Sequence, residues 1–497
     1  ILSTLAQSIH SRSAARRSVA RRGRSGPSPT ASSPKRPRVC EGSLTTRVLT
    51  KIFDTAFSFQ MLVLTTESMS FSIWRETPIP MYLESYFFNI TNVNEILAGT
   101  AEKIKVVEMG PYVFKESHTK VNLTWNDENS TLTFYNQRFW HFQPEMSNGS
   151  LSDNVTSINP IVTVAYMMRN QNYFIRLGVE GFLRLYHNNM FLTANVSSWM
   201  FDGISDPVLN IASEMPQLPI VIPYDKFGWF YERNGSIEYD GSFNINTGAS
   251  DFSMLGNVHE WRYRNRTNYR DKCGEVKGST GELWAPETGQ PELFVFASDI
   301  CTYLTLSKDR DLQVEGIDGV QYAANDSAFD NGHKYPHMAC YCDNVRDVNC
   351  VPSGALNVSE CRYGAPAFVS LPHFLHADPS YARKIDGLNA TEDMNFRLAL
   401  EMFTGMPLSV AAQLQINLLV RRIRGIPINN ALPDPDTMVP MFWFRQETQT
   451  TPEYAALARS ALRLRYWVPY GLYALTVSSI PFLLLQYKYI LFYNIKY

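Results

Sequence analysis

Residues 333–350 read HKYPHMACYCDNVRDVNC, and they lie in a stretch that holds six of the seven cysteines of the 497-residue chain. The six are Cys273, Cys301, Cys340, Cys342, Cys350 and Cys361. An even cluster of this kind is either a disulfide framework or a metal site. The two alternatives imply different cellular compartments, so this choice precedes any statement about function.

Zinc is the metal that this stretch would suit, because His333, His337, Cys340 and Cys342 offer nitrogen and sulfur ligands. Structural zinc sites normally leave two to four residues between paired ligands, whereas Tyr341 alone separates Cys340 from Cys342. Disulfides suit the spacing better if the segment lies outside the cytosol.

Glycosylation acceptors of the Asn-X-Ser/Thr type give independent evidence about the compartment. They are Asn89, Asn122, Asn129, Asn148, Asn154, Asn195, Asn234, Asn265, Asn325, Asn357 and Asn389. So many acceptors, all between residues 89 and 391, indicate a glycosylated lumenal or extracellular domain. We therefore expect disulfides, no metal and no cofactor, although the spacing does not choose the pairing.

The two ends of the chain differ in composition from its middle. Residues 1–50 are rich in Arg and Ser and carry a single acid, Glu41, so we expect a disordered segment or a misassembled start, since the chain opens on Ile1. A nucleic-acid arm or a transit peptide is the functional alternative for this segment. Cys40, the seventh cysteine, would be a free thiol or a lipidation site.

The middle of the chain predicts an α+β fold dominated by antiparallel sheet. Short aromatic-rich runs separated by turn residues indicate strands, at 82–90, 105–107, 112–114 and 132–135. Residues 414–420 alternate between apolar and polar side chains, which predicts a strand with one buried face. With 13% aromatic and 45% hydrophobic residues, the chain can bury a sizeable core.

Between residues 159 and 201 the apolar period becomes helical, which predicts a helical subdomain inserted into the sheet protein. The polar residues of this subdomain include Arg169, Arg176, Arg184 and His187, with Glu180 opposing them. This face is either a docking patch for anionic ligands or an ordinary solvated helix surface.

Residues 467–486 contain no charged residue and begin with aromatic side chains, so we predict a transmembrane helix there. A buried core helix is the alternative. The glycosylation acceptors then place residues 51–466 outside the cell as an ectodomain, and 487–497 as a short cytoplasmic tail.

Catalytic motifs are missing from the sequence. No nucleophile elbow and no phosphate-binding glycine loop occurs, and His259-Glu260-Trp261-Arg262-Tyr263 has tyrosine where a zinc protease needs its second histidine. We therefore expect a binding or transfer protein rather than an enzyme, with a lipid-hydrolysing ectoenzyme as the less favoured alternative.

Several short stretches together resemble the class B scavenger receptor family. In chain order they are Gly110-Pro111-Tyr112, Ser298-Asp299-Ile300-Cys301, Cys340-Tyr341-Cys342, 370–375 (SLPHFL) and 414–420 (LQINLLV). The ordered set spans about residues 55 to 486 and includes the six cysteines. Thr77-Pro78-Ile79-Pro80-Met81-Tyr82 is most similar to arthropod members of the croquemort type.

The resemblance implies a large β-barrel-like ectodomain anchored by terminal membrane helices, with an apical helical bundle at 159–201, a disulfide-rich segment at 273–361 and a lipid tunnel. It also implies a disulfide pairing of Cys273 with Cys340, Cys301 with Cys361 and Cys342 with Cys350. The first membrane helix would precede about residue 55, where the basic segment 1–50 stands instead.

The function that the resemblance implies is a plasma-membrane scavenger receptor that takes up lipid through an ectodomain tunnel. Its ligands would be fatty acids, sterols, lipoproteins or phosphatidylserine-bearing surfaces such as apoptotic cells and microbes, and not nucleic acid. A lysosomal membrane transport receptor for a protein or lipid cargo is the alternative within the family.

Overall fold

The computed structural model describes residues 61–163, 167, 170–214, 224–286, 289–342, 350–434 and 436–494. All of them belong to the second of the chain's two units, Leu49–Tyr497. The basic segment 1–50, Cys40 and Arg169 lie outside the described residues.

One large sheet dominates the described part of the chain. Along its main path the strand order is β10 (Glu292–Ala297), β11 (Thr302–Val314), β12 (Ile317–Ala324), β16 (Arg397–Leu400), β17 (Pro407–Arg421), β18 (Asp436–Gln449), β1 (Met81–Ile90), β2 (Ile104–Asn126), β3 (Thr131–Phe142), β8 (Ser242–Asn246) and β9 (Val258–Trp261). Off this path, β13 (Leu356–Asn357) pairs with β14 (Ala367–Ser370), β14 with β17, and β15 (Ile385–Asp386) with β2. The strand pairs are antiparallel except for β15 with β2.

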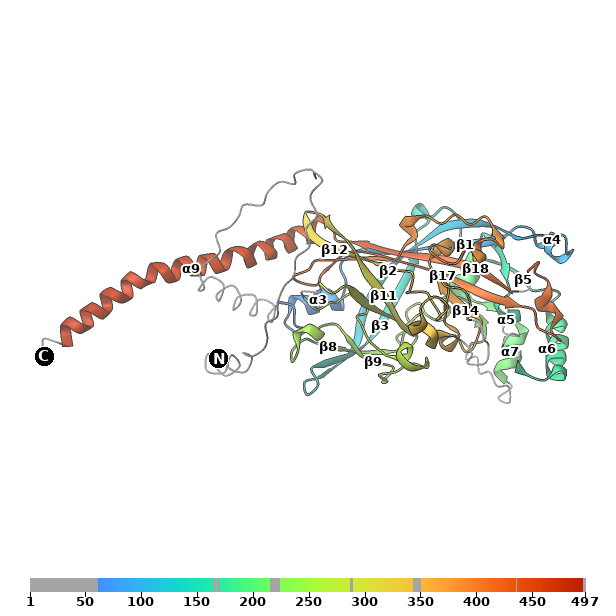
Figure 1. Cartoon of the computed structure of the whole chain (residues 1–497), viewed down its shortest axis with the longest axis horizontal. Helices are drawn as coiled ribbons and strands as arrows, with labels where there is room; N and C mark the ends of the chain where they lie inside the picture. Colours follow the sequence, from blue (N-terminus) through green and yellow to red (C-terminus); the bar gives the residue numbers. More distant parts are fainter. Residues whose placement is uncertain are drawn as a thin grey trace, which may run out of the picture. The chain divides into compact units, whose positions relative to one another are not determined.

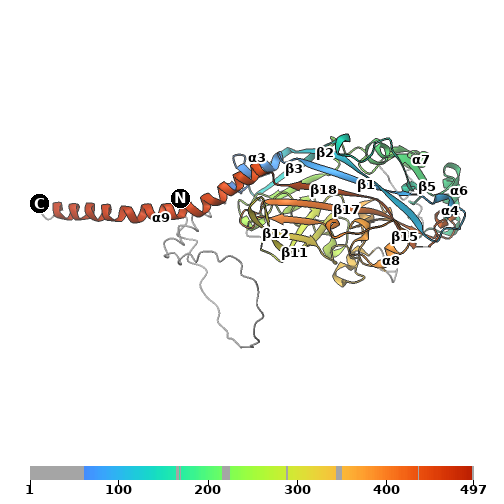
Figure 2. The same cartoon turned by 90° about the horizontal axis from the view of Figure 1, so that it is seen from above.

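The two end strands of this path are linked through the segment Gly278–Ser279. The amide of Val258, in β9, donates to Gly278 O over 2.7 Å, and the amide of Phe296, in β10, donates to Ser279 O over 2.8 Å. The sheet therefore curls into a nearly closed barrel, as Figures 1 and 2 show. This confirms the predicted antiparallel, barrel-like core.

Two short hairpins and several helices complete the described structure. The hairpins are β4 (Asn154–Ile158) with β5 (Phe191–Asn195), and β6 (Ile204–Ser205) with β7 (Lys226–Phe227). The α-helices are α3 (Met69–Arg75), α4 (Val93–Leu97), α5 (Pro160–Thr163), α6 (Tyr173–Tyr186), α7 (Pro207–Glu214), α8 (Pro379–Ala382) and α9 (Pro452–Asn494). The short helical turns are η1 (Pro144–Met146), η3 (Ser198–Asp202), η4 (Phe252–Met254), η5 (Asp271–Gly274), η6 (Pro336–Tyr341), η7 (Ser359–Cys361), η8 (Pro372–Phe374), η9 (Glu392–Met394) and η10 (Pro427–Asn430).

Helices α5, α6 and α7 gather at one end of the barrel, and α9 begins at the opposite end (Figures 1 and 2). Helix α6 starts where the side chain of Asn172 accepts a hydrogen bond from the amide of Ile175, an N-cap that satisfies a free amide of the first turn. The predicted segment 159–201 is only partly helical, because strand β5 follows α6.

Strands β2 and β3 show why the interior of the barrel is partly polar. Between residues 112 and 120 of β2 the even-numbered side chains point inward, so Glu116 and Lys120 are buried together with Phe114. On β3 the inward row includes Arg138 and Trp140, and the register places Trp140 opposite Glu116. The sheet thus carries charged side chains into its own interior.

The expectation that residues 414–420 bury only one face is wrong. The polar side chains of Gln415 and Asn417 are both fully buried, because β14 and the turn η8 cover them. Gln415 Oε1 accepts from the amide of His373 over 2.6 Å, and Asn417 Nδ2 donates to Ser370 Oγ over 3.0 Å. The alternation is real, but its polar face is satisfied by protein rather than by water.

The disulfides have the pairing that the resemblance implies. Cys273 is bonded to Cys340, Cys301 to Cys361, and Cys342 to Cys350. With all of these sulfurs engaged, the zinc alternative for Cys340 and Cys342 has no thiolate to use.

Helix α9 includes the predicted membrane span 467–486, with Pro469 and Pro481 inside it. Its first turn packs against the barrel, where Ala455 is fully buried beside Val314 and Leu408. No helix of the described residues combines the length and apolar content needed to cross a bilayer. The membrane span therefore stays a prediction.

Candidate functional site

A cavity of about 210 Å³ lies inside the barrel. Its apolar wall comes from alternate residues of two paired strands: Leu414, Ile416 and Leu418 on β17, and Phe442 and Phe444 on β18. Because the side chains of a strand alternate between faces, these residues form a continuous row on the inner face. A hydrocarbon chain would find no polar atom along this row of side chains.

The loop that follows β7 adds aromatic rings to the lining of the cavity. The ring of Trp229 lies 4.9 Å from that of Phe442, and Phe230 meets Trp140 edge to face at 5.5 Å. Such rings bury large apolar areas in a fixed geometry. The cavity is therefore walled by rigid apolar groups, which is typical of pockets for small hydrophobic ligands.

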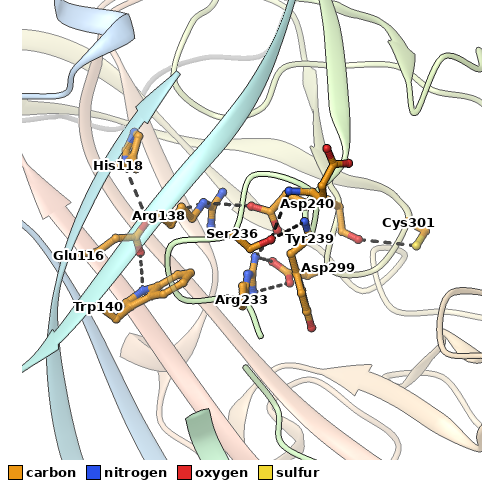
Figure 3. Close-up of polar contacts among 12 residues, drawn as sticks. Glu116, His118, Arg138, Trp140, Arg233, Ser236, Tyr239, Asp240, Asp299 and Cys301 are labelled. Atoms are coloured by element: carbon orange, nitrogen blue, oxygen red, sulfur yellow. Dashed lines mark hydrogen bonds and ion pairs between the residues drawn. The ribbon is translucent and has the colours of Figure 1, made fainter. Parts of the chain in front are cut away.

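Charged side chains line the cavity beyond Phe444, where Gln446 donates to Glu116. Figure 3 shows the polar contacts among these charged residues. Arg233 is only 5% exposed, and its guanidinium donates to Asp240 Oδ1 over 2.8 Å and to Asp299 Oδ1 over 2.8 Å. Arg138 lies 3.2 Å from Asp240 and 3.8 Å from Glu116. We call Glu116, Arg138, Arg233, Asp240 and Asp299 the charged cluster.

Within the charged cluster, Asp299 and Arg233 hold each other in the ionised state. Burial disfavours the charge of Asp299, but the guanidinium groups of Arg233 and Arg138 outweigh it and keep the pKa of this carboxyl below its usual range. Burial likewise opposes the charge of Arg233, yet Asp240 and Asp299 raise its pKa further above the usual value. The cavity thus ends at fixed, paired charges.

A second buried group continues from the charged cluster along β2. The fully buried Lys120 has its Nζ 2.6 Å from Glu282 Oε1, and Nε2 of His118 lies 2.8 Å from the same oxygen. Burial would raise the pKa of Glu282, but the ammonium of Lys120 and the bond to His118 lower it below its usual range. Burial and the nearby Lys120 lower the pKa of His118.

Three of the predicted docking residues, Arg176, Arg184 and His187, are described and lie at the helical end of the barrel, where carboxylates of the chain engage Arg184 and His187. Arg184 Nε donates to Glu180 Oε1 over 2.8 Å, and His187 Nε2 lies 3.2 Å from Asp206 Oδ2. Glu180 is itself buried and accepts the amide of Ile428. Arg176 lies on the same helix. Whether these residues dock anionic ligands stays a prediction.

Helix α6 also exposes large apolar side chains, which the charge pattern of the sequence did not indicate. Phe174 is 81% exposed and Leu185 is 76% exposed. Leu177 is 48% exposed and lies between them at helical spacing. The exposed surface of this helix is therefore at least as apolar as it is cationic.

His373 and His376, three residues apart, have partners in separate places. His373 Nδ1 accepts the amide of Asn389 over 3.0 Å, so its Nε2 donates to Glu108 Oε2 over 2.7 Å. His376 Nε2 instead lies 3.0 Å from Glu392. No group of three His, Cys, Asp or Glu within the described ranges is placed to hold a metal ion.

The glycosylation acceptors differ in exposure. The exposed ones are Asn122, Asn129, Asn148, Asn154, Asn234, Asn265 and Asn389. Asn89, Asn195 and Asn325 are partly buried, whereas Asn357 is only 5% exposed and bonded through Oδ1 to the amide of Ser359. Surface access thus supports most of the predicted sites and argues against Asn357.

Sequence reasoning missed the charged cluster. Asp299 appeared only as part of the Ser298-Asp299-Ile300-Cys301 motif, and Arg233 adjoins a glycosylation acceptor, Asn234. One signal was present: Glu116, His118 and Lys120 recur at every second position, so they share one face of a strand. From the sequence alone, a strand face made of charged and polar residues is predicted to face solvent rather than the interior of the barrel.

Comparison with known proteins agrees with this architecture. The sequence profile of the CD36 family matches residues 39–487. The chain is 32% identical over 400 residues to Protein peste of Drosophila melanogaster, covering 80% of this chain and 71% of that protein. It is 35% identical over 385 residues to scavenger receptor class B member 1 of Cricetulus griseus (76% of this chain, 72% of that one), and 29% identical over 451 residues to human lysosome membrane protein 2 (89% and 88%). The chain therefore belongs to the CD36 family of non-enzymatic membrane scavenger receptors.

Proposed function

We propose that the chain is a lipid receptor that binds lipids, lipoproteins or phosphatidylserine-bearing surfaces at the helical end of its barrel and passes hydrophobic ligand through the interior cavity. The observation that carries this proposal is the apolar wall formed by Leu414, Ile416 and Leu418, inside a barrel whose relatives include a scavenger receptor. Fatty acids and sterols are the ligand types that such a wall suits.

The strength of binding would come mainly from the hydrocarbon part of the ligand. Each methylene that leaves water for the cavity contributes roughly 0.8 kcal/mol. Charge would act earlier, at the helical end, where Arg176 and Arg184 would attract anionic head groups and the exposed Phe174 and Leu185 would contact acyl chains.

Blocking the cavity tests the transport step. Ile416→Trp fills the cavity wall, whereas Val107→Trp adds similar bulk on the outer face of β2, where Val107 is 54% exposed. In cells that express equal surface amounts, the first variant should lose uptake of fluorescent lipid from lipoprotein while still binding the particle, and the second should retain both. If lipid uptake by the Ile416 variant is unchanged, the cavity is not the route of transport and the protein acts as a simple adhesion receptor.

The docking step needs its own test. Replacing Arg169, Arg176, Arg184 and His187 together by alanine should weaken binding to phosphatidylserine vesicles and not to neutral ones. If binding to both vesicle types is unchanged, the cationic residues play no part in docking and the exposed apolar side chains of α6 remain as the contact.

The membrane that holds the receptor is the plasma membrane in this proposal, with the ectodomain outside and residues 467–486 as the anchor. Exposed apolar side chains on α9, among them Leu475 and Phe482, and the membership of the CD36 family support the anchor. The similarity to lysosome membrane protein 2 favours the lysosomal membrane as the second candidate. The steady-state localisation of the full chain in cells decides between the two membranes. Assignment of the chain to the croquemort type rests on the sequence resemblance alone.

A further inference from the structure

The turn that joins β9 to the helical turn η5 carries a concentration of positive charge. Residues 262–272 read RYRNRTNYRDK, with five basic residues and a single acid, in a chain whose formal net charge is −2. We call residues 262–272 the basic turn. Its basic side chains are all exposed: Arg262, Arg264, Arg266, Arg270 and Lys272. Like charges gathered on one surface attract anions and speed their association.

Two of these arginines are held in place without losing their charge. Arg262 donates to Tyr239 O and Arg270 donates to Cys342 O, each over 2.9 Å. A backbone carbonyl fixes the direction of a guanidinium group but carries no net charge. The positive charge of both side chains therefore stays available to a bound anion.

Carboxylates near the basic turn do not neutralise it. Arg266 donates to the backbone oxygen of Asp271 rather than to its side chain. Glu275 pairs with Arg266 in a β-bridge, but its carboxylate lies 3.6 Å from Lys277. In the stretches that the structure describes, no carboxylate lies within ion-pair distance of a basic side chain of the turn. The turn therefore presents charges with which a bound anion can pair.

The basic turn is anchored to the barrel at both ends, so its charges are arranged before any ligand binds. Trp261, directly before it, is 7% exposed and donates from Nε1 to Asp240 O over 2.8 Å. Cys273, directly after it, is bonded to Cys340. Tyr269, inside the turn, is 5% exposed. A binding surface that is already ordered loses little conformational entropy when its ligand binds.

An exposed aromatic ring stands between Arg262 and Arg264. Tyr263 is 68% exposed, and its hydroxyl lies 2.9 Å from that of Tyr135, which fixes the ring. The φ angles of Arg262 and Tyr263 are 51° and 58°, a left-handed conformation that bulky residues rarely adopt and that clusters at ligand-binding sites. Because the face of an aromatic ring is electron-rich, it suits the C–H groups of a sugar ring.

The position of the basic turn favours a linear polyanion over a lipid surface. Figure 1 shows β9, from which the turn leaves, between the end of the barrel where α9 begins and the helical end. A lipid particle that docks at the helical end meets the tip of the barrel, whereas a polymer can run along its side. The structure describes the whole turn, and Tyr263 is the one large apolar side chain that the turn exposes, against several on α6. A lipid surface would need more apolar contact than this.

We propose that the basic turn is a docking site for a sulfated polysaccharide. Sulfate groups would accept hydrogen bonds from Arg264, Arg266 and Arg270, and a sugar ring would pack on Tyr263. The planar guanidinium fork suits sulfate, since its paired N–H groups match two oxygens of one group. The site goes beyond the proposed lipid receptor, because it uses neither the cavity nor the helical end. It would hold the ectodomain on the polysaccharide of a cell or matrix surface.

Binding of heparin to the full chain in lipid nanodiscs tests the site, with desulfated heparin as the matched probe. The test variant replaces three arginines of the turn by glutamine: Arg264, Arg266 and Arg270. It should bind heparin roughly tenfold to a hundredfold more weakly at physiological salt. The slope of log affinity against log salt should become smaller by about three, close to one for each cation removed. The unmodified protein should prefer heparin to desulfated heparin by about tenfold or more.

The matched control removes the same charge from exposed cations that carboxylates already engage, with glutamine at Lys308, Arg310 and Lys334. Its heparin affinity should stay within about twofold of that of the unmodified protein. A second variant, with lysine in place of the three arginines of the turn, covers the case in which the glutamine variant fails to fold. It should keep the salt slope and lose about threefold in affinity. Because Asn265 is an exposed glycosylation acceptor within the turn, all proteins are also compared with Asn265→Gln, and the same ranking is expected.

Three outcomes would overturn the site. The first is equal heparin binding by the glutamine variant and its control, and the second is equal binding of heparin and desulfated heparin by the unmodified protein. The third is a loss of binding to phosphatidylserine vesicles in the glutamine variant as large as its loss of heparin binding, which would make the basic turn a lipid contact instead. Lipid uptake through the cavity is measured separately, so a failure of the proposed function leaves this test unaffected.

Discussion

Replacing Lys120 by methionine should destabilise the barrel by about 3 kcal/mol, near the lower end of the 3 to 5 kcal/mol typical of a broken buried ion pair. The side chain of Lys120 is 0% exposed, and its Nζ lies 2.6 Å from Glu282 Oε1. Without the ammonium, Glu282 keeps only His118, whose pKa is lowered by burial, as a partner. Glu282 retains 30% of its side-chain exposure, so water hydrates part of the orphaned carboxylate and limits the loss.

Removing both charges should cost much less than removing one. The double variant Lys120→Met/Glu282→Met leaves no unpaired charge, so we expect a loss of about 1 kcal/mol or less. Lys115 lies on the outer face of the same strand and is exposed, which makes Lys115→Met the matched control, with an expected change within about 0.5 kcal/mol. The free energy of unfolding is measured for the purified full chain by urea titration, followed by tryptophan fluorescence.

The way in which stability changes with pH tests the same ion pair independently, because it should differ in direction between the unmodified protein and the Lys120 variant. In the unmodified protein the pKa of Glu282 lies below its usual 4.5, so its stabilising contribution is present above pH 4.5 and is lost as the pH falls through the folded-state pKa. In the Lys120 variant burial raises this pKa above the unfolded value, and stability then falls as the pH rises. The difference between the two proteins should be largest near neutral pH and should shrink as the pH falls below 4.5 towards the folded-state pKa of Glu282. A loss no larger than that of the Lys115 variant, or a double variant as unstable as the single one, would refute the reasoning.

Three further predictions concern the stability of two variants and the glycosylation of two asparagines. Gly110→Ala places a Cβ 2.7 Å from Ser85 O at a φ of +136°, so it should destabilise the chain by about 2 kcal/mol in the same urea titration, and a neutral result would contradict the strand geometry. Phe442→Ala removes a ring that is 2% exposed beside the cavity and should cost about 3 to 5 kcal/mol, whereas a loss below about 1 kcal/mol would mean that the cavity collapses around it. Peptide mass mapping should find glycan on the exposed Asn389 and none on the buried Asn357, and full occupancy of Asn357 would show that its strand forms differently.

The sequence predicts the features of this fold that depend on local pattern. Aromatic-rich runs bounded by turn residues, at 82–90 and 132–135, identify β1 and β3. The fold class follows from many such runs, and the pairing of Cys342 with Cys350 agrees with the family resemblance. What alternation cannot supply is the identity of the inner face, since Glu116, His118 and Lys120 satisfy the pattern of a solvated face equally well.

The helical end illustrates a second limit, which concerns charge. Arg184 and His187 suggest a cationic face in the sequence, but Glu180 is the i,i+4 partner of Arg184, and Asp206 reaches His187 from a different element. Local spacing predicts the first pair. The second depends on where α7 lies relative to α6, and this information exists only in the folded chain.

The charged cluster is better explained by the cavity than by stability. A buried ion pair is weak evidence for stability, because well-packed apolar residues of the same volume would hold the barrel at least as firmly. Here Arg233 and Asp299 stand where the apolar row of β17 and β18 ends, and Gln446 ties that end to Glu116. A hydrocarbon chain can occupy the row but cannot displace these charges without leaving them unpaired. In the proposed function, the cluster would set the depth to which the apolar part of a ligand enters the cavity.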